Sequence, residues 1–450
     1  MKLMKDIKKK LTESTTLKVI IIIVLIVLFM IPNAMVKELI FERQNTEFQV
    51  KKEIGSKWGA PQFLTGPFLV IPYKKKKIVT FNAGEEKIEF YDRELQVLPK
   101  TLNISGDLNP IVRKRGIYKA ILYDALLDFE GNFELPDFDK LGIDTNLINW
   151  NKIVINIGIK DMGGIKESIT LKWGNINSIS LEPGIKGNIA GTGASAIINF
   201  DREKYGNSID FSFNVKLQGS ESIYFTPLGK TTTVALKSSW DSPSFQGRFV
   251  PDDREISSDG FTANWKILDM NRNYPQQWEG SKYNITPSKF GVKLIKPVGE
   301  YQKNMRTIKY SLLIIVLIFL IYFFFEILGK FRIHPIQYSF IGLALTMFFV
   351  LLLSISEQLG FNIAYLISSL ATSAIILIYS ASLLKDKKKL GVLTGFLALI
   401  YGFIYIVLQL EDYALLAGSI GLFLALFAAM FYSRKIDWYN ININIPGKDE

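Results

Sequence analysis

The chain contains 450 residues, no cysteine and a single histidine, and its formal net charge is +11. The absence of cysteine excludes disulfides, thiolate metal ligands and cysteine nucleophiles. Most of the basic excess flanks apolar runs, where it orients helices and faces anionic lipid, so the charge does not indicate a nucleic-acid partner.

The N-terminal region predicts a membrane anchor followed by a helical stalk. Residues 1–18 are polar and carry six lysines against two acids, and residues 19–36 form an apolar run. This run is longer than the apolar part of a signal peptide and lacks a small-x-small cleavage site, so we expect an uncleaved transmembrane helix. Residues 37–62 are rich in Glu, Lys and Gln, and their apolar positions follow a helical period, which predicts the stalk.

Residues 63–309 change to a period of two, which is typical of strands. Between residues 209 and 217, large apolar side chains alternate with Asp, Ser, Asn and Lys, and isoleucines alternate in the same way between 153 and 159. Clusters of Gly, Asn, Asp and Pro separate the candidate strands as turns. Many short antiparallel-type strands without intervening helices predict a large β-rich, sandwich-like domain.

Residues 310–432 contain five apolar runs, each close to the 20 or so residues that a helix needs to cross a membrane. The runs are residues 310–328, 336–355, 361–384, 390–410 and 413–432. The loops after the first, third and fifth runs are basic, whereas the other two carry only acids. Since basic short loops stay in the cytoplasm, we expect both termini there, including a tail at 433–450, and residues 37–309 outside. The predicted fold class is an α+β membrane protein with six transmembrane helices, one N-terminal and five C-terminal, and the β domain between spans one and two.

The junction at residues 325–338 is the most unusual one, because it holds the one histidine, His334, near Glu326, Lys330 and Arg332. One interpretation is a titratable or partner-docking loop, because histidine titrates near neutral pH. The interpretation that we favour is structural: Glu326 and Lys330 pair at i,i+4, and Pro335 starts the next helix. One histidine without an acid cluster beside it does not predict a metal site.

In the outer domain, residues 239–249 form the densest cluster of aromatic, Gly and Pro residues. A binding ridge is one interpretation, but aromatic packing under a constrained turn is favoured. No histidine lies in this domain, which excludes a Ser-His pair there. The acid pairs Asp252-Asp253 and Glu85-Glu86 stand in polar turns, and nothing singles them out as a glycosidase-like pair.

Seven short motifs follow one another along the chain in a specific order and spacing. Their candidate functional positions are Gly66 and Pro67; Arg115, Gly116 and Tyr118; Trp240, Pro243, Phe245 and Gly247; Glu326; Arg332, His334, Pro335, Gln337 and Tyr338; Glu357; and Asp437, Trp438 and Tyr439. On these motifs the chain resembles the CreD family of bacterial inner-membrane proteins over nearly its whole length. The resemblance implies a multi-pass protein of the inner (cytoplasmic) membrane that contributes to cell envelope integrity. It also implies a link to a two-component envelope response, altered tolerance to E-group colicins and β-lactam phenotypes.

The resemblance implies no enzymatic reaction and no ligand, so it supplies no catalytic, cofactor-binding or metal-binding residue. The leading hypothesis is therefore a non-enzymatic envelope factor, with the lipid bilayer and an envelope protein or cell-wall component as partners; the oligomeric state is left open. A membrane enzyme acting on a lipid-linked or cell-wall substrate is a second hypothesis, and it predicts a carboxylate-lined pocket in the outer domain. A transporter is the third, and it predicts polar residues converging at the membrane midplane, although the spans contain few ionisable residues.

Overall fold

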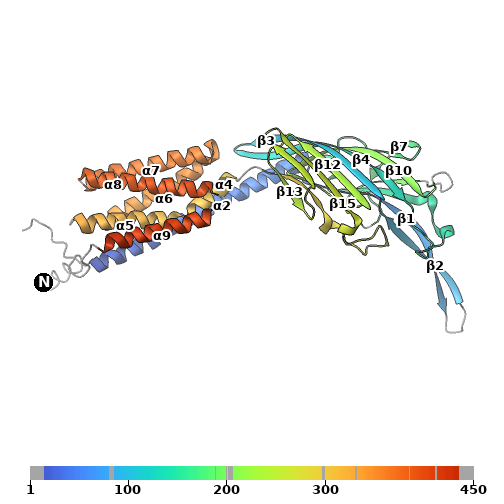
Figure 1. Ribbon diagram of the computed structural model, residues 1–450, viewed down its shortest axis with the longest axis horizontal. Coiled ribbons are helices and arrows are strands. Elements are labelled where there is room, and N and C mark those ends of the chain that lie inside the picture. Colours follow the sequence, from blue (N-terminus) through green and yellow to red (C-terminus); the bar gives the residue numbers. More distant parts are fainter. Residues whose placement is uncertain are drawn as a thin grey trace, which may run out of the picture. The chain divides into compact units, whose positions relative to one another are not determined.

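The computed structural model describes residues 15–80, 86–187, 189–198, 200, 206–295, 299–329, 332–384, 386–410 and 413–434. The chain divides into two compact units (Figure 1). The first, called here the helical unit, comprises Met1–Glu47 with Val298–Glu450. The second, the β unit, comprises Phe48–Pro297.

Helices make up the helical unit, and all of them except the short polar helix Glu300–Ile308 contain long apolar stretches, since continuous apolar segments in lipid must satisfy their backbone groups internally. These helices are α2 (Thr15–Trp58), α4 (Glu300–Ile308), α5 (Ser311–Gly329), α6 (Pro335–Leu359), α7 (Phe361–Leu384), α8 (Lys387–Gln409) and α9 (Ala414–Ser433). Helix α2 continues without interruption past Glu47, so its last residues belong to the β unit.

Among the described residues, four helices are long and apolar enough to cross a membrane: α2, α6, α7 and α8. Helices α4 and α5 are bent by 42° at their junction and make a fifth span if the pair is counted as one. The apolar part of α9, Leu416–Phe431, is shorter. The described helices therefore support four or five spans, and six remains a prediction.

Close packing joins α2, α5 and α6. The Phe29 ring of α2 lies directly against Gly342 of α6, where a Cβ atom would collide with it. The same ring meets Phe319 of α5 edge to face, with the centroids 6.3 Å apart. Small residues allow such close approach between membrane helices.

Two sheets form the β unit. The first follows the order β13-β17-β11-β1-β5-β9-β8, with β2 on β1 and β16 on β2. Its strands are β1 (Gln62–Thr80), β2 (Glu86–Val97), β5 (Ile153–Ile159), β8 (Glu182–Pro183), β9 (Gly193–Ile198), β11 (Ser222–Phe225), β13 (Pro243–Gly247), β16 (Gln277–Glu279) and β17 (Phe290–Leu294).

The second sheet follows the order β14-β15-β12-β3-β4-β10-β6-β7. Its strands are β3 (Thr101–Arg115), β4 (Tyr118–Glu134), β6 (Thr170–Trp173), β7 (Ile176–Ser180), β10 (Ser208–Ser220), β12 (Thr231–Ser238), β14 (Asp253–Ser257) and β15 (Gly260–Leu268). Short 3-10 helices lie at Thr145–Leu147, Trp150–Lys152, Met162–Gly164, Asp269–Asn271 and Thr286–Ser288. Most pairs are antiparallel, as expected, but β1–β11 and β12–β3 are parallel. The sequence pattern did not predict these two pairs, because side-chain alternation is the same in parallel and antiparallel strands.

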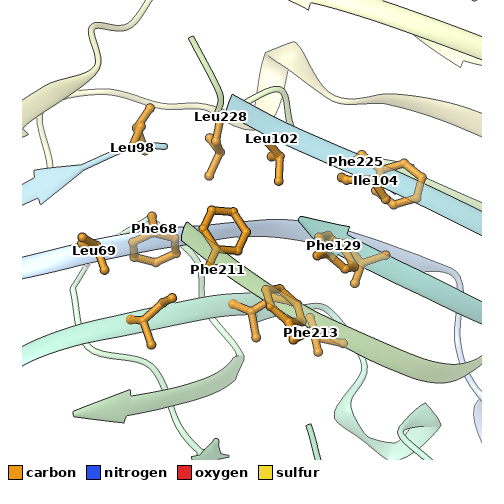
Figure 2. Close-up of a cluster of buried hydrophobic side chains, with 14 of the residues drawn as sticks. Phe68, Leu69, Leu98, Leu102, Ile104, Phe129, Phe211, Phe213, Phe225 and Leu228 are labelled. Carbon is orange, nitrogen blue, oxygen red and sulfur yellow. The ribbon is translucent and has the colours of Figure 1, made fainter. Parts of the chain in front are cut away.

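Both sheets contribute side chains to one hydrophobic cluster. Figure 2 shows Phe68 of β1, Phe129 of β4 and Phe211 and Phe213 of β10 within it. The rings of Phe129 and Phe213 stack with their centroids 4.8 Å apart. Across the sheets, Trp265 of the second packs against Phe245 and Phe290 of the first, with centroids 5.7 Å apart in each pair. Aromatic burial of this kind dominates the energetics of a core, and these pairs hold the two sheets together.

Strand β10 alternates between buried and exposed side chains over Ile209–Lys216, as the period of two predicts. Strand β5 does not, and the expectation of a wet face there is wrong: all seven of its residues are buried. The reason is that a following segment covers its second face. The backbone N–H of Lys186 donates to Asn156 Oδ1 at 2.9 Å, and Ala190 lies against Gly158.

Candidate functional site

The motif residues at the α5–α6 junction gather around Glu326. In the described part of the chain it is the one buried carboxylate, with 0% of the residue exposed. Lys18 of α2 forms an ion pair with its Oε1 atom. The Tyr338 hydroxyl, in the first turns of α6, donates to its Oε2 atom at 3.4 Å. One carboxylate therefore joins three helices. We call Lys18, Glu326 and Tyr338 the Glu326 cluster.

The ion pair seen in this cluster has a partner that helix spacing does not suggest. Glu326 pairs with Lys18, from the N-terminal part of the chain, while Lys330, the expected i,i+4 partner, lies outside the described residues. Arg332 lies close enough to Lys18 for the two cations to repel each other. A buried acid that is ion-paired in this way fixes helices relative to one another rather than offering a free proton acceptor.

His334 occupies the N-terminal cap of α6. Its Nδ1 atom accepts from the backbone N–H of Ile336 at 3.3 Å, and its own backbone N–H donates to Gln337 Oε1 at 2.8 Å. Pro335 is the first residue of the helix. This reciprocal pattern is a capping box, which satisfies N–H groups that have no partner within the helix.

A second polar cluster surrounds Glu357, near the C-terminal end of α6. The Tyr301 hydroxyl of α4 donates to Glu357 Oε1 at 2.8 Å, and Arg43 Nε of α2 lies 3.8 Å from the same oxygen. Beside it, the Asn304 amide donates to Ser356 Oγ at 2.8 Å, with both residues buried. We call Arg43, Tyr301, Asn304, Ser356 and Glu357 the Glu357 cluster.

The two clusters lie at opposite ends of the helical unit. Tyr338 and Glu357 are 19 residues apart on α6, which corresponds to about 28 Å along a helix. This separation is close to the thickness of a bilayer hydrocarbon core, roughly 30 Å. The polar groups therefore lie where side chains can reach the two interfaces.

In the β unit, two motifs position the chain at turns. Gly66 has φ +132° at the bulge in β1, where an added Cβ would lie 3.0 Å from the Asn156 carbonyl oxygen; Pro67 follows it after a cis bond. Arg115 and Tyr118 pair at the end of the β3–β4 hairpin, with Gly116 in the turn. The guanidinium of Arg115 contacts Glu53 Oε2, on the last turns of α2, at 2.6 Å.

The third motif of the β unit packs inward. The indole N–H of Trp240 donates to the carbonyl oxygen of Ile295 at 2.9 Å. The Phe245 ring lies edge-on to Phe261 and Trp265, at 5.7 Å in each case. Pro243, Phe245 and Gly247 belong to β13, at the edge of the first sheet. These contacts are those of a packed strand edge rather than of an exposed ridge.

The exposed face of the second sheet carries shallow cavities. The first measures about 460 Å³ and is lined by Asp128, Glu130, Asp252 and Asp253 among others, all four exposed. Two more, of about 490 and 300 Å³, lie on the same sheet. Within the described residues no group of three or more His, Asp or Glu side chains could hold a metal ion. Glu85, Asp437, Trp438 and Tyr439 lie outside the described residues.

Several residues with structural roles were not singled out by the sequence. Lys18 and Arg43 were indistinguishable from other charged residues beside a membrane span, and Asn304 from any polar residue. Arg272, buried to 6% exposure, donates from its guanidinium to the carbonyl oxygens of Tyr274 and Leu228 at 2.6 and 3.3 Å. A charge excess beside an apolar run could have singled out Lys18, but its partner could not have been inferred.

The comparisons with known proteins agree with the helices and with the motifs. The family model described as "Inner membrane protein CreD" matches residues 14–439. A relative named "Inner membrane protein CreD", from Escherichia coli (strain K12), is 30% identical over 424 residues, which cover 93% of this chain and 92% of the relative. The chain belongs to the CreD family of inner membrane proteins.

Proposed function

We propose that this protein is a non-enzymatic factor that maintains cell envelope integrity from the inner membrane. In this proposal six spans hold the chain in the membrane, both termini are cytoplasmic, and residues 37–309 lie outside. The β unit, a sandwich-like domain, acts as a binding module toward an envelope protein or a cell-wall component. The membrane-spanning helices and the family membership support this placement.

The observation that carries the proposal is the Glu357 cluster. The chain leaves the helical unit through α2 and returns to it through α4, and Arg43 of α2 and Tyr301 of α4 both contact Glu357. Both connections to the β unit therefore meet at one end of α6. Arg332 and the lysines at 387–389 stand at the starts of α6 and α8, which is the opposite end of α6 and the expected cytoplasmic side. This arrangement supports a β unit inserted on the outer side of the membrane.

The exposed carboxylates of the second sheet support a binding role better than catalysis. Asp128, Glu130, Asp252 and Asp253 are all exposed on an open face. A general acid needs a pKa near the working pH, which usually requires burial beside a like charge or an apolar wall. Solvated acids of this kind are suited to contacts with a partner.

Single-cysteine labelling tests the orientation cleanly, because the natural chain has no cysteine. Thr262→Cys lies on an exposed position of β15, and Arg434→Cys follows α9. In spheroplasts, a membrane-impermeant maleimide should label Thr262→Cys directly, and Arg434→Cys only after permeabilisation. The reverse pattern would overturn the proposed topology.

Complementation tests the role of the β unit. In a strain that lacks the protein, the full chain should restore the resistance of the cells to agents that damage the envelope. A chain lacking residues 60–300 should not restore it. The truncated chain must be present in the membrane fraction at the level of the full chain, which immunoblotting checks. Full restoration by the truncated chain would show that the helical unit alone carries the function.

A further inference from the structure

The exposed face of the second sheet is a continuous array of polar rows. Directly opposed residues form one row across six strands: Lys266, Thr233, Asn103, Glu130, Ser212 and Lys172. A neighbouring row consists of Asp253, Asn264, Ala235, Ser105, Asp128 and Asn214. Neighbouring strands lie about 4.8 Å apart, so each row is roughly 24 Å long. We call this array the polar face.

Cavities of a size that holds small ligands lie along the polar face. Those of about 460 and 490 Å³ share β3, β12 and β15, and the one of about 300 Å³ lies over β4, β6 and β10. Ligand sites typically measure about 300–1,000 Å³. Amide and hydroxyl side chains such as Asn103, Ser105 and Thr233 provide hydrogen-bonding groups at the floor.

The cavities along the polar face carry a charge opposite to that of the chain. The residues that line the three cavities include seven carboxylates and three lysines, which leaves a net charge of −4, whereas the whole chain carries +11. One of these lysines, Lys237, is already paired with Asp107 at 3.0 Å. Such a face repels polyanions, including nucleic acids, anionic lipids and phosphate-rich polymers, and it attracts amines.

The polar face lacks the apolar centre that protein partners use. Trp265, Ile104 and Val234 line the first cavity but are themselves buried in the core. The exposed large apolar side chains nearby are single ones on three different strands: Ile256 beside the second cavity, and Leu126 and Leu268 in the rows that adjoin the polar face. Protein interfaces concentrate their binding energy in exposed aromatic and apolar anchors. A ligand rich in hydroxyl groups, which needs many hydrogen bonds and few apolar contacts, matches this lining better.

We infer that the polar face binds a glycan that carries free amino groups. This inference rests on the proposed function, because it requires the β unit to face the envelope. Asp128 and Glu130 lie in adjacent rows near the middle of β4, between Ser105 and Asn103 on one side and Asn214 and Ser212 on the other. Their carboxylates accept charge-assisted hydrogen bonds from the amines, while the neighbouring amides and hydroxyls bind the sugar hydroxyls.

The test is a titration of the full-length protein in nanodiscs of uncharged lipid. Four probes are compared by calorimetry at low salt: a glucosamine hexamer, an N-acetylglucosamine hexamer, a sulfated oligosaccharide and an oligolysine of the same charge as the glucosamine hexamer. The glucosamine hexamer should bind most tightly, the acetylated hexamer more weakly, and the sulfated probe not at all.

Matched variants locate the binding. Asp128→Asn with Glu130→Gln should weaken binding of the glucosamine hexamer by at least about tenfold, which is the factor expected from the loss of a single charge-assisted hydrogen bond. Asp92→Asn with Glu182→Gln makes the same charge change at exposed positions of the other sheet and should leave affinity unchanged. Asn214→Lys adds a cation beside Asp128 and should weaken binding to a similar degree. It serves as a second test if the acid double variant folds poorly.

Three results would overturn the inference: oligolysine binding more tightly than the glucosamine hexamer, affinity unaffected by the polar-face variants, or no glycan binding. Oligolysine binding would identify the face as an interface for a basic protein segment. If the labelling and complementation results hold while glycan binding fails, the inference alone is lost. If the truncated chain restores resistance, the proposed function is lost whatever the glycan result.

Discussion

Replacing either partner of the Lys18–Glu326 ion pair should destabilise the helical unit, and by unequal amounts. The side chain of Glu326 is 1% exposed and that of Lys18 is 17% exposed. Lys18→Met keeps the aliphatic stem but leaves the carboxylate buried without its cation. Glu326→Gln keeps the shape but leaves the lysine, whose long stem can turn its ammonium toward water or lipid headgroups. The lysine variant should therefore be the more damaging of the two.

The size of the effect follows from the burial of the pair. Two unit charges at about 4 Å interact by about 4 kcal/mol at an effective dielectric constant of 20. Breaking a buried pair from one side costs about 3–5 kcal/mol. Lys18→Met should lower the stability of the helical unit by an amount in this range, about 4 kcal/mol. Glu326→Gln should lower it by only about 2 kcal/mol, because Lys18 regains hydration. The double variant should lose less than the sum of the two, with a coupling energy of about 3 kcal/mol.

The assay must report on the helical unit alone. The tryptophans of the described residues all lie in the β unit, so their fluorescence does not serve. A cysteine placed at Ala364, a fully buried position of α7, reports instead through its accessibility to maleimide as SDS is added. Strictly additive losses, or a larger loss for Glu326→Gln than for Lys18→Met, would refute this account of the pair.

Three further changes test other contacts. Arg272→Leu removes donors from buried carbonyl groups and should destabilise the β unit by about 3 kcal/mol, measured by tryptophan fluorescence in urea. Hydrogen bonds from Lys57 and Arg115 lower the pKa of Glu53, so this contact is intact above the ordinary glutamate pKa and is lost as the pH falls through the lowered one. After correction for the slower intrinsic exchange of amides in acid, protection at the end of α2 should therefore fall as the pH is lowered, and Glu53→Gln should remove that change. His334→Ala should cost α6 about 1 kcal/mol as a lost cap and leave the yield in the membrane fraction intact.

Local patterns predicted the long apolar helices of the helical unit. Hydropathy over about 20 residues is a property of each segment alone: the runs at 336–355 and 361–384 fall within α6 and α7, and the run at 390–410 ends one residue past α8. The alternation of residues 209–217 likewise predicted β10 with its correct buried face. The prediction that β5 alternates in the same way was wrong, because a segment about 30 residues further along the chain covers its second face. The short helix α4 was not predicted, because residues 300–308 were assigned to the β domain.

The candidate sites were less predictable than the elements that carry them. Tyr338 and Glu326 belong to motifs on either side of a short loop, so a shared site at this junction could be anticipated. Their ionic partner could not, because helix spacing favours a lysine four residues away over Lys18. The Glu357 cluster draws on α2, α4 and α6, which are widely separated in sequence.

By itself the sequence determined the membrane class, the presence of long apolar helices, the β-rich character of the region between the first helix and the C-terminal ones, and the family. Each of these depends on composition or on spacing within a short window. The tertiary structure decided which charges meet, which strands run parallel, and how six strands of the second sheet align into the rows of the polar face. Those outcomes depend on pairing between distant segments, where many partners are compatible with the same local pattern and only packing of the whole unit selects one.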